Sequence, residues 1–190
     1  MELSELVKKQ EAINRQISSV GDGTVKTDDG EEVNEGEIVQ LVTFMLDDVD
    51  YGVDILSVHE ILRIPQITRL PNTPQFIKGV INLRGNVIPV VDIRSRFGFA
   101  PKKLTDLSRI IVIEAENKQI GLLVDNVSSV IRLKDTNVDP PSEFIEGISE
   151  EFITGVGRLK DKLVVILNLK NVLYTDKEIE DRKTLAALRA

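Results

Sequence analysis

An 18-residue stretch of this chain occurs twice. Residues 76–93 read FIKGVINLRGNVIPVVDI, and residues 152–169 read FITGVGRLKDKLVVILNL. The two stretches align without a gap, and Phe76, Gly79 and Leu83 meet identical residues in the second copy. A repeat of this length is typical of two copies of one structural unit. Because both copies keep the apolar positions, they are expected to build the same local fold.

The repeat extends upstream of this stretch. YGVDILSVHEIL at 51–62 aligns with IGLLVDNVSSVI at 120–131, and the change in offset indicates a seven-residue insertion within 132–151. We therefore place copy one at about 38–100 and copy two at about 106–174. A unit of about 60 residues buries too little surface to be stable alone, so the two copies are expected to pack together. Exchange of strands between the copies is an open alternative.

The apolar segments predict an all-β fold. They are short and rich in Val, Ile, Leu and Phe, and their density suits small closed barrels. Leu83–Asn86 is expected to form a hairpin in which Gly85 and Asn86 supply the permissive φ angles. Pro89 indicates an edge strand or a bulge. Short helical turns are expected near 54–60, after Pro74 and around 92–97. The predicted strands are 39–46, 77–83, 87–91, 109–115, 119–124, 153–159 and 163–168.

The two ends of the chain differ from the repeated part. Residues 1–37 carry ten acidic and four basic side chains, whereas 38–174 is nearly neutral. Apolar residues at heptad spacing predict a helix over about 3–19, either docked on its own protein or frayed, or contacting a helical partner. Residues 21–37 are typical of a flexible acidic linker. A capping box, Thr175 to Glu178, predicts a terminal helix over 176–188, within the segment 175–190.

Few residues in the sequence point to chemistry. The chain has no cysteine and one histidine, His59, so neither a catalytic triad nor a cysteine- or histidine-rich metal site is expected. We considered Asp92 and Asp125 as an acid–base pair. Asp92 is better explained as the cap of the turn after its strand, with Asn168 in the same place in copy two. We expect no cofactor, no metal and no catalytic residue. No apolar run approaches the length of a membrane span.

Some surface positions are candidates for binding. Arg84 lies at the hairpin tip, where it is either a solvated turn residue or a guanidinium presented to a partner, and Glu60 has the opposite charge to pair with it. Val58 and Val127 are equivalent in the repeat, so they either face a shared groove or both lie in the core. Phe144, in the inserted loop, is either a cap over a barrel end or an interface anchor.

Several of these segments carry a resemblance to a known family. They are YGVDILSVHEI at 51–61, PQFIKGVINLRGNVIPVVD at 74–92, GLLVDNV at 121–127 and FITGVG at 152–157. Residues 38–174 resemble the chemotaxis coupling protein family, CheW, although Asn168 stands where many relatives have Asp. The resemblance implies two packed SH3-like five-stranded barrels with short connecting helices, and a non-enzymatic cytoplasmic adaptor that controls motility.

The resemblance also implies partners. Such adaptors join the helical tip of a chemoreceptor to the regulatory domain of the histidine kinase CheA, in arrays at the inner face of the membrane that can include further adaptor copies. By position, it assigns the receptor-binding groove to Val58, Glu60, Arg84, Val127 and Val130. It assigns Phe144 to a contact with the kinase or with a neighbouring adaptor. Contact with the membrane is expected only through receptors.

Two other classes of protein remain as alternatives. An enzyme would need a pocket with convergent polar groups, and the sequence offers no nucleophile and base in one motif. A nucleic-acid binder would need a basic face with stacking aromatic residues. The chain has a net charge of −7, eight Phe and Tyr residues and no tryptophan, which argues against nucleic acid as a partner.

Overall fold

The fold was analysed in a computed structural model that describes residues 37–115, 117–141, 148–160 and 162–173. The first half holds five strands and two short helices: β1 (Ile38–Leu46), β2 (Val49–Asp54), η1 (Ile55–Ser57), β3 (Val58–Arg63), β4 (Ile77–Leu83), β5 (Asn86–Asp92) and α2 (Ile93–Arg96). The second half holds β6 (Arg109–Ala115), β7 (Lys118–Val124), β8 (Asn126–Lys134), η2 (Asp135–Asn137), β9 (Val138–Asp139), η3 (Glu150–Phe152), β10 (Ile153–Leu159), β11 (Lys162–Leu167) and α3 (Leu169–Leu173).

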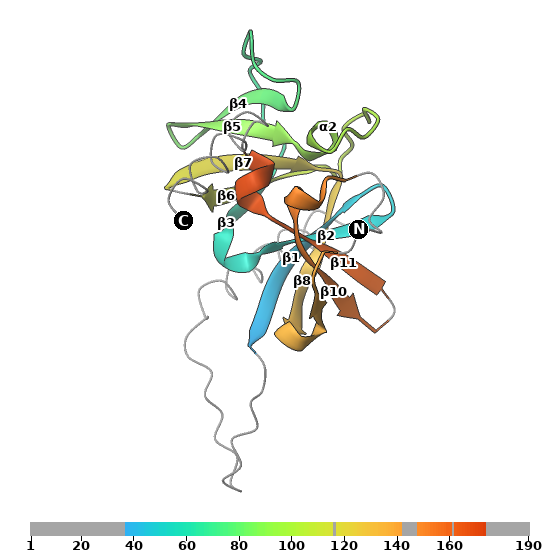
Figure 1. The fold of residues 1–190 in the computed structure, drawn as a ribbon. Helices are drawn as coiled ribbons and strands as arrows, with labels where there is room; N and C mark the ends of the chain where they lie inside the picture. Colours follow the sequence, from blue (N-terminus) through green and yellow to red (C-terminus); the bar gives the residue numbers. More distant parts are fainter. Residues whose placement is uncertain (1–36, 116, 142–147, 161, 174–190) are drawn as a thin grey trace, which may run out of the picture.

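The strands form two sheets that pack against each other (Figure 1). The five-stranded sheet has the order β3-β6-β7-β5-β4, and the six-stranded sheet has the order β8-β1-β2-β11-β10-β9. The prediction of an all-β fold is confirmed. The sixth strand, β9, has two residues and lies within the insertion of the second copy, so it extends an otherwise five-stranded arrangement. The predicted terminal helices lie outside the described residues.

Each sheet takes strands from both copies of the repeat. The first two strands of copy one join β8, β10 and β11 of copy two, while β3, β4 and β5 join β6 and β7. The equivalence of the two copies extends to individual residue pairs in the sheets. Val90 is the parallel partner of Gly121 in one sheet, and Ile166 is the parallel partner of Gly52 in the other. Neither copy therefore forms a sheet on its own.

The two glycines at these parallel ladders are explained by their neighbours. A Cβ atom on Gly121 would lie 2.7 Å from Cγ2 of Ile110, and one on Gly52 would lie 3.2 Å from Cδ1 of Leu41. Ile110 and Leu41 are themselves equivalent in the repeat. Each sheet thus places a large buried side chain of one strand over the bare backbone of the next, so a side chain at either glycine would require its neighbour to shift.

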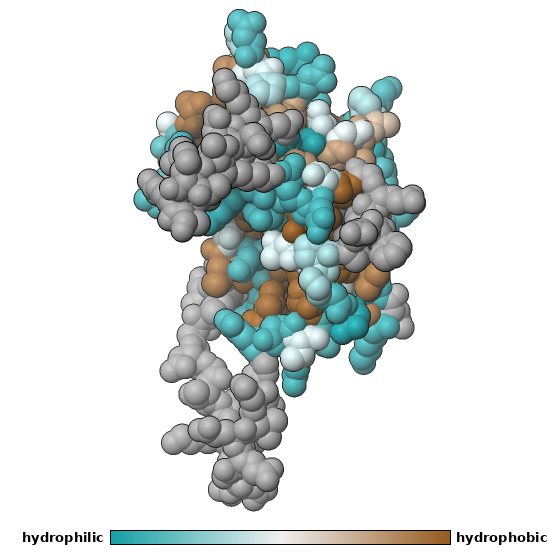
Figure 2. Space-filling model, in the orientation of Figure 1, coloured by the Kyte–Doolittle hydropathy of each residue, from teal (hydrophilic) through white to brown (hydrophobic). Residues whose placement is uncertain are grey.

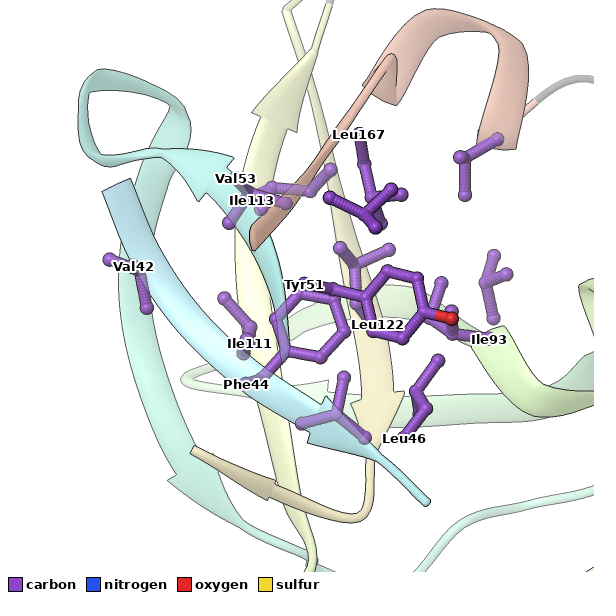
Figure 3. Close-up of a cluster of buried hydrophobic side chains, with 14 of the residues drawn as sticks. Val42, Phe44, Leu46, Tyr51, Val53, Ile93, Ile111, Ile113, Leu122 and Leu167 are labelled. Atoms are coloured by element: carbon purple, nitrogen blue, oxygen red, sulfur yellow. The ribbon is translucent and has the colours of Figure 1, made fainter. Parts of the chain in front are cut away.

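Both faces of the sheets carry buried apolar residues. One face of each sheet packs inside its own barrel, as Leu41, Val164 and Ile166 do in one barrel and Ile110 and Val112 do in the other. The other face packs between the barrels. That central cluster includes Val42, Phe44, Leu46, Tyr51, Val53, Ile93, Ile111, Ile113, Leu122 and Leu167, which converge from strands of both sheets and from α2 (Figure 3).

Burial in this central core has an electrostatic effect on Tyr51. The side chain stacks on Phe44 with ring centroids 5.9 Å apart, and the residue is 1% exposed. Removal from water disfavours the phenolate, and the negative charge of Asp47 adds to this effect, so the pKa of Tyr51 rises to about 12. Tyr51 therefore acts in the folded protein as a neutral core residue.

The hairpin between β4 and β5 forms as predicted, but its turn lies one residue earlier. Positive φ angles occur at Arg84 (52°) and Gly85 (92°), and Asn86 already belongs to β5. Two consecutive positive φ angles match the type I′ turn, which suits the right-handed twist of the strands. The side-chain oxygen of Asn82 accepts a hydrogen bond from the Gly85 N–H at 2.9 Å.

Pro89 does not mark an edge strand. Strand β5 lies between β4 and β7, and the edge strands of this sheet are β3 and β4. The pairing of β5 with β7 begins only at Val90. Pro89, which has no N–H to donate, therefore lies just before the parallel ladder and does not interrupt it. The irregularity in this hairpin falls on the partner strand, between Ile77 and Gly79.

Candidate functional site

Arg84 is presented at the surface by the tight turn between β4 and β5. Its side chain is 74% exposed, and its backbone adopts a left-handed conformation that non-glycine residues rarely adopt. This conformation costs an L-residue about 1 kcal/mol. A glycine would avoid that cost, and Asp47, Asn72 and Asn117 adopt the same conformation in other turns.

Arg84 forms an ion pair with Glu60 of β3. Nη2 of Arg84 donates to Oε2 of Glu60 at 3.1 Å, and the Glu60 side chain is only 11% exposed. The other carboxylate oxygen, Oε1, is buried and has no hydrogen-bond partner among the described residues. The pair is therefore asymmetric: a buried carboxylate holds one end of a guanidinium whose remaining N–H groups face solvent.

The three predicted valines lie at or beside the core between the barrels. Val58 begins β3 and is 3% exposed, so it belongs to the core itself. Val127 and Val130 lie on β8, opposite Phe44 and Val42 of β1, and they are half-buried against the same core. Val58 therefore contributes to the floor of any groove at this edge, whereas Val127 and Val130 keep a partly exposed surface.

These placements divide the predicted set into two groups. The structure brings Glu60 and Arg84 into direct contact on the five-stranded sheet, and it places Val58, Val127 and Val130 around one core. Val58 links the groups, because it precedes Glu60 by two residues on β3. Phe144 lies outside the described residues, so its predicted contact stays a prediction.

A charged cluster joins the two sheets just beyond the C-terminal end of β1, and the sequence patterns did not reveal it. Arg94 of α2 is 9% exposed, and its Nη1 lies 2.9 Å from both Asp47 and Asp125. Lys102 approaches Asp125 at 3.1 Å. Asp125 is thus paired with two cations, whereas Asp92 is paired with Lys78. The signal for this cluster was the charged RSR segment at 94–96, which follows a buried strand.

The cluster shifts the ionisation of its members. Hydrogen bonding from Arg94 is the largest of the effects that lower the pKa of Asp47 below its ordinary value of 3.8. The same bond is the largest effect raising the pKa of Arg94, while hydrogen bonding to Asp125 raises the pKa of Lys102. All three shifts favour the charged forms, as expected when opposite charges hydrogen-bond.

Asp92 caps α2, as predicted. Its Oδ1 accepts from the Ser95 N–H at 3.3 Å, and its Oδ2 lies 3.4 Å from Nζ of Lys78. Asn168 performs the same task in copy two, where its Oδ1 accepts from the Asn171 N–H.

His59 is exposed on β3. Among the described residues, no three His, Cys, Asp or Glu side chains gather closely enough to hold a metal ion.

Arg96 lies between two aromatic residues that the repeat makes equivalent. Its guanidinium carbon is 4.6 Å from the ring centroid of Phe76 and 4.5 Å from that of Phe152. Nε donates to the carbonyl of Val172 at 3.0 Å. This buried cation joins α2, α3 and both copies, so it serves assembly of the fold.

Within the described parts of the chain, no helix is long and apolar enough to cross a membrane.

Comparison with known proteins identifies relatives. The family model for the CheW-like domain matches residues 40–177. The chemotaxis protein CheW of Klebsiella aerogenes is 34% identical over 83% of this chain and 92% of its own length. The CheW protein of Helicobacter pylori is also 34% identical, over 77% and 87%. The crystal structure of the scaffolding protein TtCheW from Thermoanaerobacter tengcongensis superposes with a TM-score of 0.69 at 36% identity, covering 74% of this chain and 95% of that one. The chain belongs to the CheW-like family.

Proposed function

We propose that this protein is a non-enzymatic chemotaxis adaptor, which couples chemoreceptors to the histidine kinase CheA in signalling arrays. The proposal rests above all on Arg84, an exposed guanidinium held in an unfavourable backbone conformation over the buried carboxylate of Glu60. Family membership supports the coarser part of the proposal, because relatives carry the names of chemotaxis and scaffolding proteins.

The receptor's helical tip would bind at the edge of the core between the barrels. Val127 and Val130 offer a partly exposed apolar surface there, and Val58 supports it from below. An amphipathic helix bound in this way would place its apolar face against the valines. Arg84 would then fix the orientation of the helix through its free N–H groups, a role that gives specificity more than affinity.

Ion pairs and a helix cap within the chain, and not a chemical reaction, account for the aspartates of the fold. The carboxylates of Asp47 and Asp125 are paired with Arg94, and that of Asp92 caps a helix and pairs with Lys78. Phe144 is proposed as a contact to the regulatory domain of the kinase or to a neighbouring adaptor copy. The receptors would hold the adaptor in the cytoplasm, at the inner face of the membrane.

A pull-down with a receptor tip and with the kinase regulatory domain tests this proposal. Arg84→Glu reverses an exposed charge, so it is expected to weaken receptor binding without unfolding the protein. Lys160→Glu is the matched control, because Lys160 is exposed at the equivalent position of the hairpin in copy two. Val58→Glu is a poorer probe, since a buried charge at a 3% exposed position would disturb folding.

The two variants separate the possible outcomes. The proposal expects Arg84→Glu to lose receptor binding and Lys160→Glu to retain it. Equal receptor binding by the wild type and both variants would contradict the site assignment, and failure of the wild type to bind either partner would contradict the adaptor function.

A further inference from the structure

A cavity of about 800 Å³ opens at the junction of the two barrels, and Arg84 is not among its lining residues. Its floor consists of the buried side chains Leu41, Ile166 and Leu167, and Val39, Val138 and Leu169 form half-buried walls. Figure 2 looks at the molecule with α3 and η1 on the near side, and it shows apolar surface among hydrophilic residues below the centre. This groove therefore exposes apolar atoms that hydrophilic residues border.

The rim of the groove is acidic. Asp54, Glu114 and Asp135 line it, and Lys170 is the single basic residue among the described lining residues. None of the three carboxylates forms an ion pair with the described part of the chain. An apolar floor with unneutralised acidic edges favours a segment that carries apolar side chains flanked by basic ones.

The C-terminal end of this chain has that composition. Residues 182–190 read RKTLAALRA, with three basic residues, two leucines and no acidic side chain. The sequence predicts a helix over 176–188, in which Leu185 and Leu188 are neighbours on one face. The chain also arrives at the right place, since the last described residue of α3, Leu173, is only three residues beyond Lys170 of the groove.

We propose that residues 182–190 bind in this groove within the same molecule. Leu185 and Leu188 contact the apolar floor and walls, and Arg182, Lys183 and Arg189 face the acidic rim. Leu173 lies beside the groove that Leu169 and Lys170 line, so the twelve residues from 174 to 185 are long enough for Leu185 to reach it. Because the lining residues come from both sheets, the bound segment also adds a contact between the barrels. The inference is independent of receptor binding at Arg84.

Paramagnetic broadening in the full-length chain tests the proposal. The chain contains no cysteine, so Ala187→Cys provides a unique site for a nitroxide label. Amide signals of Ser57, Glu114 and Ala115 around the groove are expected to lose most of their intensity. The matched control carries the same label with Leu185→Ser and Leu188→Ser, which keeps the tether and its charges but removes the apolar contact.

The outcomes distinguish docking of the chain's own segment from docking of a second copy and from no docking in the groove. Broadening at the groove that disappears in the Leu185→Ser/Leu188→Ser control supports the proposal. Equal broadening in both chains reflects the tether alone and overturns it, as does broadening centred on another surface. A mixture of labelled chain and isotope-enriched unlabelled chain reports docking between molecules, and broadening that occurs in this mixture assigns the groove to a second copy and overturns docking within one chain.

Discussion

Asp92 and Asn168 occupy the same place in the two halves of the fold. The N–H of Asp92 donates to the carbonyl of Phe76 at 2.7 Å, and the N–H of Asn168 donates to the carbonyl of Phe152 at 2.8 Å. The side chains differ in a correlated way. Asp92 pairs with Lys78, whereas the residue equivalent to Lys78 in copy two is Thr154. Both members of the ion pair have been replaced by neutral residues, while the backbone contacts and the helix caps are kept.

This comparison predicts how Asp92 contributes to stability. Asp92→Asn should keep the cap of α2, as Asn168 does in copy two, and lose only the ion pair with Lys78. Because Lys78 is 38% exposed, the loss is expected to be below about 1 kcal/mol. Asp92→Ala removes the cap as well and should cost about 1 kcal/mol more. Urea unfolding measures both changes, and equal costs for Asn and Ala would show that the cap contributes nothing.

The ion pair between Arg84 and Glu60 should have a measurable effect on folding. Arg84→Ala leaves the buried carboxylate of Glu60 without its partner, which is expected to lower the free energy of unfolding by about 1–2 kcal/mol. In the background Glu60→Gln the same substitution should cost less, because no charge is then left unpaired. Lys160→Ala, at the exposed equivalent position, should change stability by less than about 0.5 kcal/mol. A double-mutant cycle in which the two substitutions have additive effects on the free energy of unfolding would contradict the pairing of Arg84 with Glu60.

The sequence predicted the repeat-based elements of the fold and missed others for physical reasons. The hairpins β4–β5 and β10–β11 were evident because they are the two copies of the repeat and are rich in Val, Ile and Leu. Strands β2, β3 and β8 were not among the predicted strands. In β8, the sequence NVSSVIRLK is half-buried along most of its length and mixes polar with apolar residues. The order of strands in the sheets depends on long-range pairing that local patterns do not contain.

The part of the candidate site that depends on opposite charges and on the internal repeat was predictable from the sequence. Arg84 and Glu60 were paired by opposite charge, and the structure places them in contact. The burial of Val58 could not be separated from surface exposure, because a valine in a strand is compatible with both. Arg94 and Arg96 were missed as core residues, since buried arginines depend on partners that lie far away in the sequence, such as Asp47 and Phe152.

Arg96 should resist even conservative replacement. Its planar guanidinium stacks between Phe76 and Phe152 and also donates to the carbonyl of Val172. Lysine keeps the charge but has no plane to stack and a single ammonium to donate, so Arg96→Lys is expected to cost about 1–3 kcal/mol. Arg158→Lys, at a side chain that is 56% exposed, is the control and should be nearly neutral. Thermal or urea unfolding that gave the two variants equal stability would contradict a structural role for the stacked guanidinium.

Asp47 should make the protein less stable in acid. Its folded-state pKa lies below its ordinary value of 3.8, chiefly because Arg94 hydrogen-bonds to the carboxylate. A depressed folded-state pKa means that the stabilising contribution is fully present above that ordinary value and is lost as the pH falls through the lower, folded-state value. Asp47→Asn should therefore destabilise the protein at neutral pH and reduce the loss of stability below pH 3.8. Asp48→Asn removes a neighbouring carboxylate that forms no ion pair with the described residues, so it should leave that part of the stability profile as in the wild type. Urea midpoints recorded across acidic pH provide the measurement, and superimposable profiles for wild type and Asp47→Asn would show that the Arg94 cluster does not contribute to acid sensitivity.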